Sequence, residues 1–536
     1  MKLSELLHGI EAEVSGDAEV EITGLAYDSR RIQPGYLFVA IQGEKADGRW
    51  FIPQAIERGA AAVMLSGEGP SCPPVGDRTL VRVADARKAL ALAAANFYRH
   101  PARSIRLAGV TGTNGKTTTC YLIESILAAA GCKAGLFGTI EYRLAGRRRP
   151  APHTTPESLE LQAMLAELRE LGATHAVMEV SSHALALDRV YGCPFHTAVF
   201  TNLTRDHLDF HGTMEAYFAE KRKLFDGWGA PPPAWRVLNL DDPWSAELLQ
   251  GPRSKVQGPR SLDGCATGGV LTYGFGQSAE VRPDERKPTP DGGCFTILTP
   301  WGPSESRSPL LGRPNAYNVL AAMAAALSLR IEMPSIEAGL AALENVPGRF
   351  ERVKAGQPFL VAVDYAHTDD ALRNLLATAR GLLAPGARVI TVFGCGGDRD
   401  RVKRPLMGEA AGSMSDLVVL TSDNPRSEDP LAIIDDALPG LKKTGARYHL
   451  EPDRRKAIEL AIGEARANDI VLIAGKGHED YQVIGTQKLS FDDREVAREV
   501  LASLGYKLRN GVPLLRLKEG GSPPDLGLIN RLRDEE

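Results

Sequence analysis

The stretch GVTGTNGKTTT, residues 109–119, decides the fold of the middle of the chain. It follows the apolar run IRLAGV (105–110), which predicts a strand, and it leads into TTTCYLIESILAAAG (117–131), which has the apolar spacing of a helix. A glycine-rich turn in that setting directs backbone N–H groups at one point, which is how phosphate-binding loops form. We expect Lys116 to reach the terminal phosphates of ATP and Thr117 to bind Mg²⁺.

The match to the strict phosphate-loop pattern is incomplete. That pattern has glycine five positions before Gly115, where this chain has Val110, although Gly109 and Gly112 supply flexibility nearby. The alternative is a tight turn that contains Gly-Lys-Thr by coincidence. The flanking strand and helix favour the ATP interpretation.

Composition excludes several classes of protein. The chain has 536 residues, 43% of them hydrophobic, 24% charged, with a net charge of −4, as expected for a globular protein that binds neither nucleic acid nor a membrane surface. No apolar run approaches the ~20 residues of a membrane span. The seven cysteines form no C-x-x-C pair, which argues against a zinc site or a disulfide framework. A cytoplasmic location is the simplest expectation, and the run Arg147–Arg149 is expected to be a solvated loop.

Acidic and imidazole side chains follow two further predicted strands. Glu179 lies in MEVSSH (178–183), and His207 lies in TNLTRDHLDFHG (201–212). Alone, Glu179 would be interpreted as a helix cap or a surface acid. With Thr117 these groups could instead form a Mg²⁺ site, since Mg²⁺ favours carboxylate and phosphate oxygens.

The last third of the chain alternates between strands and helices. Apolar runs at 359–365, 387–393, 416–420 and 469–475 are separated by helical patterns, which predicts a parallel, doubly wound sheet. Ligands of such sheets bind beyond the carboxyl ends of the strands. DYAHTDD, GCGGDRD, SDNPRS and GKGHED each begin where a strand stops, so we expect them to converge on one edge.

The predicted fold class is therefore α/β in three domains. They are a mixed α/β domain, a central phosphate-loop ATPase domain and a C-terminal Rossmann-like doubly wound domain. The predicted bounds are 1–101, 102–346 and 347–504, followed by an atypical tail at 505–536 that we expect to be partly disordered.

Seven motifs together resemble the Mur ligases. In order, these are GTNGKTTT, MEVSSHAL, TNLTRDHLDFHGTMEAYFAEK, GRPNAYNVLAA, PGRFE, DYAHT and GKGHEDYQ, within a resemblance that covers about residues 25–500. The resemblance implies a ligase of peptidoglycan precursor synthesis that works as a monomer and joins an amino acid to a UDP-N-acetylmuramoyl dipeptide. The N-terminal domain would bind the UDP portion, and closure of the C-terminal domain over the central one would exclude water.

The resemblance also implies roles for individual residues. The residues that match ATP contacts are Gly112, Thr113, Asn114, Gly115, Lys116, Thr117, Thr118, Asn315, Arg349 and Asp364. Those that match contacts to the UDP-muramoyl dipeptide are Ser29, Thr154, Thr155, Ser181 and Arg189, each of which would otherwise be taken for a cap, a turn or a surface residue. Lys221 matches the lysine that the family carbamylates into an anionic metal ligand beside Thr117, Glu179 and His207, although in isolation it would be an ordinary helix-surface lysine. Departures from the family pattern are Leu187 for Gln, Arg49 for His and Asp369 for Pro.

The loop DNPR (423–426) points to the incoming amino acid. It resembles the type that uses meso-diaminopimelate, whose far carboxylate the planar guanidinium of Arg426 would grip while Pro425 limits the loop's freedom. Further residues that match contacts to this amino acid are Arg399, Asp423, Asn424, Gly475 and Glu479. Outside this family context the loop would be a surface turn capped by Asp423. Three alternatives stay open: a lysine-adding ligase of the same family, folylpolyglutamate synthetase, and a phosphate-loop ATPase switch that is not a ligase.

Overall fold

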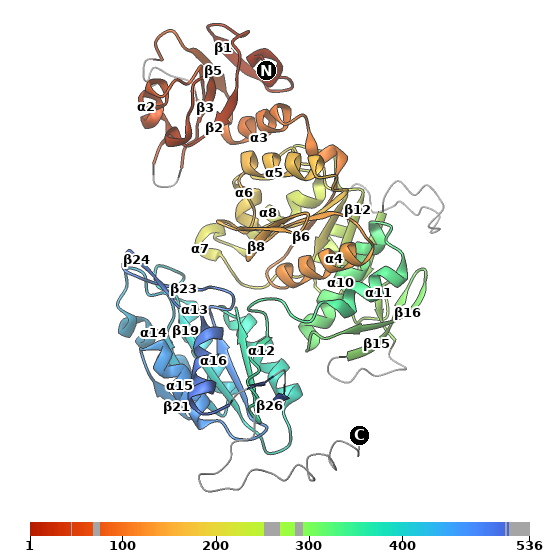
Figure 1. Ribbon diagram of the computed structural model, residues 1–536, viewed down its shortest axis with the longest axis vertical. Coiled ribbons are helices and arrows are strands. Elements are labelled where there is room, and N and C mark those ends of the chain that lie inside the picture. Colours follow the sequence, from red (N-terminus) through yellow and green to blue (C-terminus); the bar gives the residue numbers. More distant parts are fainter. Residues whose placement is uncertain are drawn as a thin grey trace. The chain divides into compact units, whose positions relative to one another are not determined.

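The computed structural model describes residues 1–43, 46–67, 75–250, 269–284, 293–506, 508–509 and 512–513. The chain divides into two compact units, Met1–Glu344 and Asn345–Glu536, whose elements are labelled in Figure 1. The division, after Glu344, falls two residues before the boundary predicted at 346. No helix within the described ranges is long and apolar enough to cross a membrane.

The first unit begins with a five-stranded sheet of order β1-β5-β4-β3-β2, parallel except for β1. Its strands are β1 (Ala12–Ser15), β2 (Gly24–Ala26), β3 (Tyr36–Ala40), β4 (Ala62–Ser66) and β5 (Thr79–Val83). Its helices are α1 (Leu3–Leu6), α2 (Ile52–Glu57), α3 (Ala86–Phe97) and the 3₁₀ turns η1 (Ser29–Arg31) and η2 (Gly48–Phe51). Leucines and alanines of α1 and α3 cover one face and α2 covers the other, so this part is the expected mixed α/β fold.

A second, eight-stranded sheet of order β13-β12-β11-β6-β10-β7-β8-β9 carries the phosphate loop. Its strands are β6 (Arg106–Thr111), β7 (Ala134–Phe137), β8 (Glu141–Leu144), β9 (Arg147–Pro150), β10 (His175–Glu179), β11 (Thr197–Phe200), β12 (Trp235–Asn239) and β13 (Gly269–Tyr273). Strands β13 to β7 in this order run parallel, and their continuous buried runs are typical of a sheet covered on both faces.

Helices cover both faces of this sheet. They are η3 (Pro101–Ser104), α4 (Lys116–Ala129), α5 (Ser158–Glu170), α6 (Ser182–Ala186), α7 (Leu208–His211), α8 (Met214–Asp226), α9 (Ser245–Leu249), α10 (Arg313–Ser328) and α11 (Met333–Ala342). Helix α4 packs against α10 and α11 on one face, while α5 and α8 share a hydrophobic core on the other (Figure 1). A small antiparallel sheet of β14 (Arg282–Pro283), β15 (Gly293–Thr299) and β16 (Gly302–Ser308) packs on α11.

The arginine run 147–149 differs from its prediction as a loop. It is exposed, as expected, but it forms β9, the edge strand paired antiparallel with β8. An exposed edge strand needs no apolar alternation, and charged side chains there hinder pairing with other chains. Hydrophobic periodicity therefore could not indicate it.

The second unit is a doubly wound sheet, as predicted. Its order is β17-β18-β22-β19-β20-β21, parallel except for β17. Its strands are β17 (Glu351–Arg352), β18 (Leu360–Asp364), β19 (Val389–Cys395), β20 (Leu417–Ser422), β21 (Tyr448–Leu450) and β22 (Ile470–Ala474). Apolar residues of α12 (Asp369–Leu382), α13 (Lys403–Met414) and α14 (Pro430–Lys443) form the core on one face, and those of α15 (Arg454–Glu464) and α16 (Asp493–Ser503) form it on the other.

The four motif-bearing strands of this unit are neighbours in the order β18-β22-β19-β20. Asp364 pairs with Ala474 and Cys395 pairs with Ser422 at their carboxyl ends, so the four loops do converge on one edge. A hairpin of β23 (Tyr481–Ile484) and β24 (Gln487–Ser490) follows the last loop. Of the predicted tail, only Gly505, Tyr506 and the paired residues of β25 (Leu508–Arg509) and β26 (Val512–Pro513) lie among the described residues, so the prediction of disorder falls outside them.

Candidate active site

The phosphate loop connects β6 to α4 in a conformation that needs glycine. Gly112 has φ +147°, and a Cβ there would collide with the hydroxyl of Thr201. The next residues are held from the segment after β11: Asn202 accepts from the Thr113 N–H at 2.8 Å, and its side chain accepts from the Asn114 N–H at 2.9 Å. Gly115, with φ +88°, is the N-cap from which α4 starts at Lys116. Residues 201–204 (TNLT) thus hold the phosphate loop in its conformation. The sequence did not indicate these contacts.

Two lysines converge on the same loop carbonyl. The Lys116 ammonium donates to the carbonyls of Gly112 (2.9 Å) and Thr113 (2.8 Å). Lys221, which lies on α8, donates through Nζ to the same Gly112 carbonyl at 2.9 Å. Lys221 is only 1% exposed and lies over the ring of Tyr217 at 4.4 Å. Burial, reinforced by the charge of Lys116, holds the pKa of Lys221 well below its usual value. The alternative of an ordinary surface lysine is therefore wrong.

Glu179, the last residue of β10, is 1% exposed and faces the start of α4. One of its oxygens accepts from the Thr139 N–H at 2.8 Å, and the other accepts from the hydroxyls of Thr117 (3.0 Å) and Thr139 (3.1 Å). The carboxylate is neither a helix cap nor a surface acid. Thr139, which follows β7, the strand next to β10, was not among the residues predicted from the sequence.

His207 lies at the edge of this cluster. It adopts a left-handed conformation (φ 54°) as the N-cap of α7, with Nε2 3.3 Å from the Asp206 carboxylate and its ring edge-on to that of His183 at 4.8 Å. Desolvation lowers the pKa of His207, which keeps the imidazole neutral and able to act as a ligand. Thr117 contacts Glu179 directly, whereas the ring of His207 lies 6.2 Å from that of Tyr217, whose hydroxyl is 3.3 Å from that of Thr113 in the phosphate loop.

The kinds of side chain in this cluster suit Mg²⁺. A carboxylate and a hydroxyl meet next to the phosphate loop, and their oxygens match the preference of this ion, while the neutral imidazole of His207 lies at the edge of the cluster. Within the described ranges, no group of three or more His, Cys, Asp and Glu is gathered as a metal site. A full site on this chain would therefore need groups outside that list, such as Thr117, substrate oxygens or a modified Lys221.

Three of the residues expected to contact the dipeptide substrate form a chain that ends at Glu179. Thr155 donates from its hydroxyl to the Glu179 carbonyl at 2.8 Å and accepts from the Ser181 N–H at 3.1 Å. Arg189 donates to the Thr155 carbonyl at 3.2 Å and pairs with Glu157 at 2.9 Å. The hydroxyl of Thr154 lies 3.1 Å from that of Thr139 and so joins the chain. Ser29 is separate: it lies in the five-stranded domain, where its buried hydroxyl donates to Gln54 at 2.6 Å.

The expected ATP contacts outside the loop occupy both compact units. Asn315 begins a relay to the phosphate-loop helix, because it accepts from Asn318 at 3.1 Å and Asn318 accepts from Thr119 at 3.4 Å. Thr118 is buried within α4. In the second unit the Arg349 guanidinium lies 4.8 Å from the ring centre of Tyr365. Asp364 accepts from the N–H groups of Phe350 (2.7 Å) and Ala366 (2.8 Å), while burial raises its pKa against the opposing charge of Arg349.

The DNPR loop is an ordered, largely buried structure. Asn424 is 3% exposed, donates to Glu479 at 2.9 Å and accepts from Lys476 at 3.2 Å. Asp423 is also buried, and a Cβ on Gly475 (φ +116°) would come within 2.5 Å of its carboxylate. The alternative of a solvated surface turn is therefore wrong. Lys476, a fully buried cation, is a member of this site that the sequence analysis missed although it stands in GKGHED.

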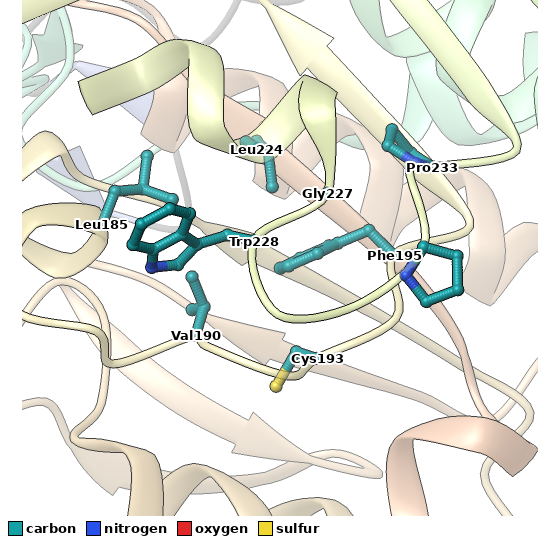
Figure 2. A pocket seen from close by; sticks show the side chains of 9 residues that line it. Leu185, Val190, Cys193, Phe195, Leu224, Gly227, Trp228 and Pro233 are labelled. Atoms are coloured by element: carbon teal, nitrogen blue, oxygen red, sulfur yellow. The ribbon is translucent and has the colours of Figure 1, made fainter. Parts of the chain in front are cut away.

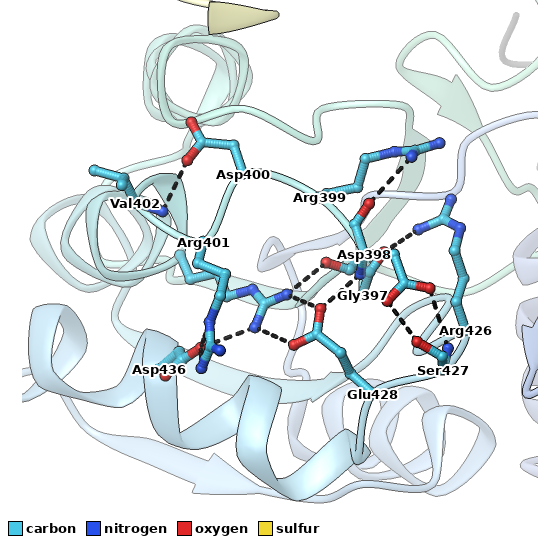
Figure 3. A network of polar contacts seen from close by, with 12 residues as sticks. Gly397, Asp398, Arg399, Asp400, Arg401, Val402, Arg426, Ser427, Glu428 and Asp436 are labelled. Carbon is cyan, nitrogen blue, oxygen red and sulfur yellow. Dashed lines mark hydrogen bonds and ion pairs between the residues drawn. The ribbon is translucent and has the colours of Figure 1, made fainter. Parts of the chain in front are cut away.

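Arg426 and Arg399 lie on two adjacent loops (Figure 3). Arg426 has φ +54°, its backbone pairs with Val483 of β23, and its guanidinium donates to the Gly397 carbonyl at 2.6 Å. Arg399 donates to the Asp398 carbonyl at 3.2 Å. The carbonyl of Pro425 accepts from the Glu428 N–H at 3.1 Å, closing the turn.

A small apolar cavity in the first unit does not belong to this site. Figure 2 shows the side chains that line it, among them Leu185, Cys193, Phe195 and Trp228. Its volume is about 10 Å³. Such a space holds one water molecule at most.

The three departures from the family pattern are local: Arg49 pairs with Asp47, the Leu187 carbonyl accepts from Arg87, and Asp369 begins α12, where a carboxylate is favoured.

Three family models match this chain in the order of its domains. They are described as "Mur ligase family, catalytic domain" (residues 21–98), "Mur ligase middle domain" (110–326) and "Mur ligase, glutamate ligase domain" (348–477). A relative from Solibacter usitatus is 54% identical over 489 residues, which are 91% of this chain and 95% of the relative. The chain belongs to the Mur ligase family.

Individual members and neighbours of the Mur ligase family refine this placement. The Solibacter relative and one from Syntrophomonas wolfei (48% identical, 94% of this chain and 99% of the relative) are both named UDP-N-acetylmuramoyl-L-alanyl-D-glutamate–2,6-diaminopimelate ligase. A solved structure of a ligase with that name is 33% identical, with a TM-score of 0.64, covering 94% of this chain and 99% of the other. A folylpolyglutamate synthase from Mycobacterium tuberculosis (19% identical, TM-score 0.57, 72% and 92% covered) shares the fold alone. The protein is thus an ATP-dependent amide-bond-forming ligase and not a phosphate-loop switch.

Proposed function

We propose that this ligase adds meso-2,6-diaminopimelate to the D-glutamyl side-chain carboxylate of UDP-N-acetylmuramoyl-L-alanyl-D-glutamate. The observation that carries the proposal is the 54% identity to a relative of that name over 95% of its length. The arginines of the DNPR and GDRD loops add chemical support, because diaminopimelate differs from lysine by a carboxylate at its far end.

The reaction needs activation of a carboxylate. The glutamyl carboxylate attacks the γ-phosphorus of ATP, so that an acyl phosphate forms and ADP leaves; the amine then attacks the acyl carbon and phosphate leaves. Both reactants of the first step are anionic. Lys116, now bonded to two loop carbonyls, would turn its ammonium to the transferring phosphoryl group and offset that repulsion. We assign Gly112–Thr118, Asn315, Arg349 and Asp364 to ATP.

Mg²⁺ is a further part of the proposal. When bound, it would neutralise charge on the phosphates, and the residues that would hold it are Thr117, Glu179, His207 and Lys221. The lowered pKa of Lys221 supports its carbamylation. The neutral amine would attack CO₂, so that an N–C bond forms while one C–O π bond opens onto oxygen, and the release of one proton would leave a carbamate anion in place of the amine.

The two organic substrates would contact different sets of residues. Thr154, Thr155, Ser181 and Arg189, linked to the Glu179 backbone, would orient the muramoyl dipeptide, and Ser29 would contact its UDP portion. Arg399, Asp423, Asn424, Pro425, Arg426, Gly475 and Glu479 would hold diaminopimelate. The domain boundaries at 101, 346 and 504, the monomeric state and the cytoplasmic location stay predictions of the sequence.

The direct test measures phosphate release with purified protein, ATP and Mg²⁺. We expect turnover only when the UDP-dipeptide and diaminopimelate are both present. Turnover with a folate substrate and glutamate would favour folylpolyglutamate synthetase instead, and equal turnover with lysine would favour the lysine-adding type.

A further inference from the structure

A fully buried arginine lies behind the loops that carry Arg399 and Arg426. Arg404, in the first turn of α13, is 0% exposed. It grips both carboxylate oxygens of Glu428, at 2.7 and 2.9 Å, and also donates to the Gly396 carbonyl at 3.2 Å (Figure 3). This two-pronged geometry is the strong, directional form of an arginine–carboxylate pair. The hydrogen bonds from Arg404 hold the pKa of Glu428 at about 2, so this carboxylate is ionised at neutral pH.

Glu428 bridges the two loops. It belongs to the segment that begins with DNPR, yet its carboxylate accepts from the Asp398 N–H of the GDRD loop at 2.6 Å. Ser427 repeats the link in reverse, because the Asp398 carboxylate accepts from its hydroxyl (2.7 Å) and its N–H (3.2 Å). Arg404 therefore fixes the position of the Glu428 carboxylate, which connects the two loops.

The same two loops also meet at their tips. The Gly397 N–H donates to the Asn424 carbonyl at 2.9 Å, and Arg426 donates to the Gly397 carbonyl at 2.6 Å. The spacing between the loops thus fixes where the Arg426 guanidinium points. It also fixes Arg399, which is bonded to the Asp398 carbonyl whose own N–H contacts Glu428.

We propose that Glu428, clamped by Arg404, is a positioning residue that sets the distance between Arg399 and Arg426 and so determines selectivity for an amino acid with a second carboxylate. This inference rests on the proposed function, because it takes these two arginines as the contacts of that carboxylate. Arg404 is fully buried and the Glu428 carboxylate is bonded to Arg404 and Asp398, so both would act through the two arginines. Their effect is to hold a pair of long, flexible cations in the geometry that one anion can bridge.

Asp436 provides a matched control. It accepts from Arg404 at 2.8 Å and from Arg401 at 2.8 and 3.0 Å, so it is a second anion on the same buried arginine. It lies on α14 and has no bond to the 423–428 loop in the described network. Asp436→Asn therefore removes one charge from Arg404 while leaving the bridge between the loops.

The experiment compares Glu428→Gln with Asp436→Asn in the full-length enzyme, using meso-diaminopimelate, ATP and the UDP-dipeptide. We expect Glu428→Gln to raise the KM for diaminopimelate about tenfold, with kcat and the KM for ATP changed by less than about twofold. Asp436→Asn should leave all three within about twofold. In an Arg426→Ala background Glu428→Gln should add much less, because both changes disable the same contact.

Four results would overturn the inference: an unchanged KM for diaminopimelate in Glu428→Gln, an equal rise in the KM for ATP, the same effect from Asp436→Asn, or full additivity with Arg426→Ala. If Glu428→Gln does not fold, Ser427→Ala on the exposed side of the bridge takes its place, with an expected rise of about threefold. Failure of the proposed function has a different signature, since the unmutated enzyme would then show no preference for diaminopimelate over lysine.

Discussion

The hydroxyl of Thr117 donates to the carboxylate of Glu179 across 3.0 Å, joining the first turn of the phosphate-loop helix to the end of the neighbouring strand. The two residues are 62 positions apart in sequence and meet only because β6 and β10 are adjacent and parallel. Lys221 donates to the Gly112 carbonyl of the phosphate loop. This lysine and the Thr117–Glu179 contact define the centre to which we assign ATP and Mg²⁺.

Removal of the phosphate-facing cation should stop the reaction. We expect Lys116→Ala to lower kcat at least about 100-fold, as is typical for the loss of a group that stabilises transferring charge. The measurement is amide formation by chromatography. Lys133→Ala, which changes an exposed lysine beyond the same helix, is the control and should be near normal. Near-normal turnover in Lys116→Ala would remove the phosphate-loop assignment.

Lys221→Ala should also impair turnover, and added acetate or formate should restore part of it by supplying the missing anion. The matched control is Lys223→Ala on the same helix, a partly buried lysine that pairs with Glu220 at 2.7 Å. Isotope-labelled bicarbonate should give a carbamate signal in the unmutated protein that Lys221→Ala lacks. An unmodified lysine in the active, Mg²⁺-bound enzyme would contradict carbamylation.

Glu179→Gln should raise the Mg²⁺ concentration needed for half-maximal activity by roughly 10- to 100-fold, the usual cost of disturbing a metal site. His207→Ala should act in the same direction. A titration of activity against Mg²⁺ measures both, with the exposed Glu170→Gln as the control. If the Mg²⁺ dependence stays unchanged, the two residues have structural roles instead.

Buried His175 should make the fold sensitive to acid. Burial, aided by the charge of Arg106, lowers the pKa of His175 to about 4, whereas an unfolded histidine titrates near ~6.5. Between these values the unfolded chain binds more protons, so the free energy of unfolding falls as pH drops from about 6.5 to about 4. The expected loss is roughly 1–3 kcal/mol. His175→Gln should flatten the dependence of Tm on pH over this range, and parallel curves for the two proteins would refute the assignment.

The sequence was sufficient for the parts of the site that depend on strand order along the chain. Apolar runs located β18, β19, β20 and β22, and parallel strands must end at one edge, so convergence of their loops could be predicted. Pairs such as Thr139 with Glu179 could not be predicted without knowing which strands are neighbours. The Arg404–Glu428 clamp was missed for the same reason, because its partners come from a helix and a loop whose packing no local pattern records.

The central claim is tested most directly by kcat/KM for meso-diaminopimelate and for L-lysine in the unmutated enzyme. A charge-assisted contact to the far carboxylate predicts a preference for diaminopimelate of roughly 10- to 100-fold, before repulsion between Arg426 and the lysine ammonium is added. Arg426→Ala should lose most of that preference through a raised KM. Equal kcat/KM for the two amino acids in the unmutated enzyme would contradict the account.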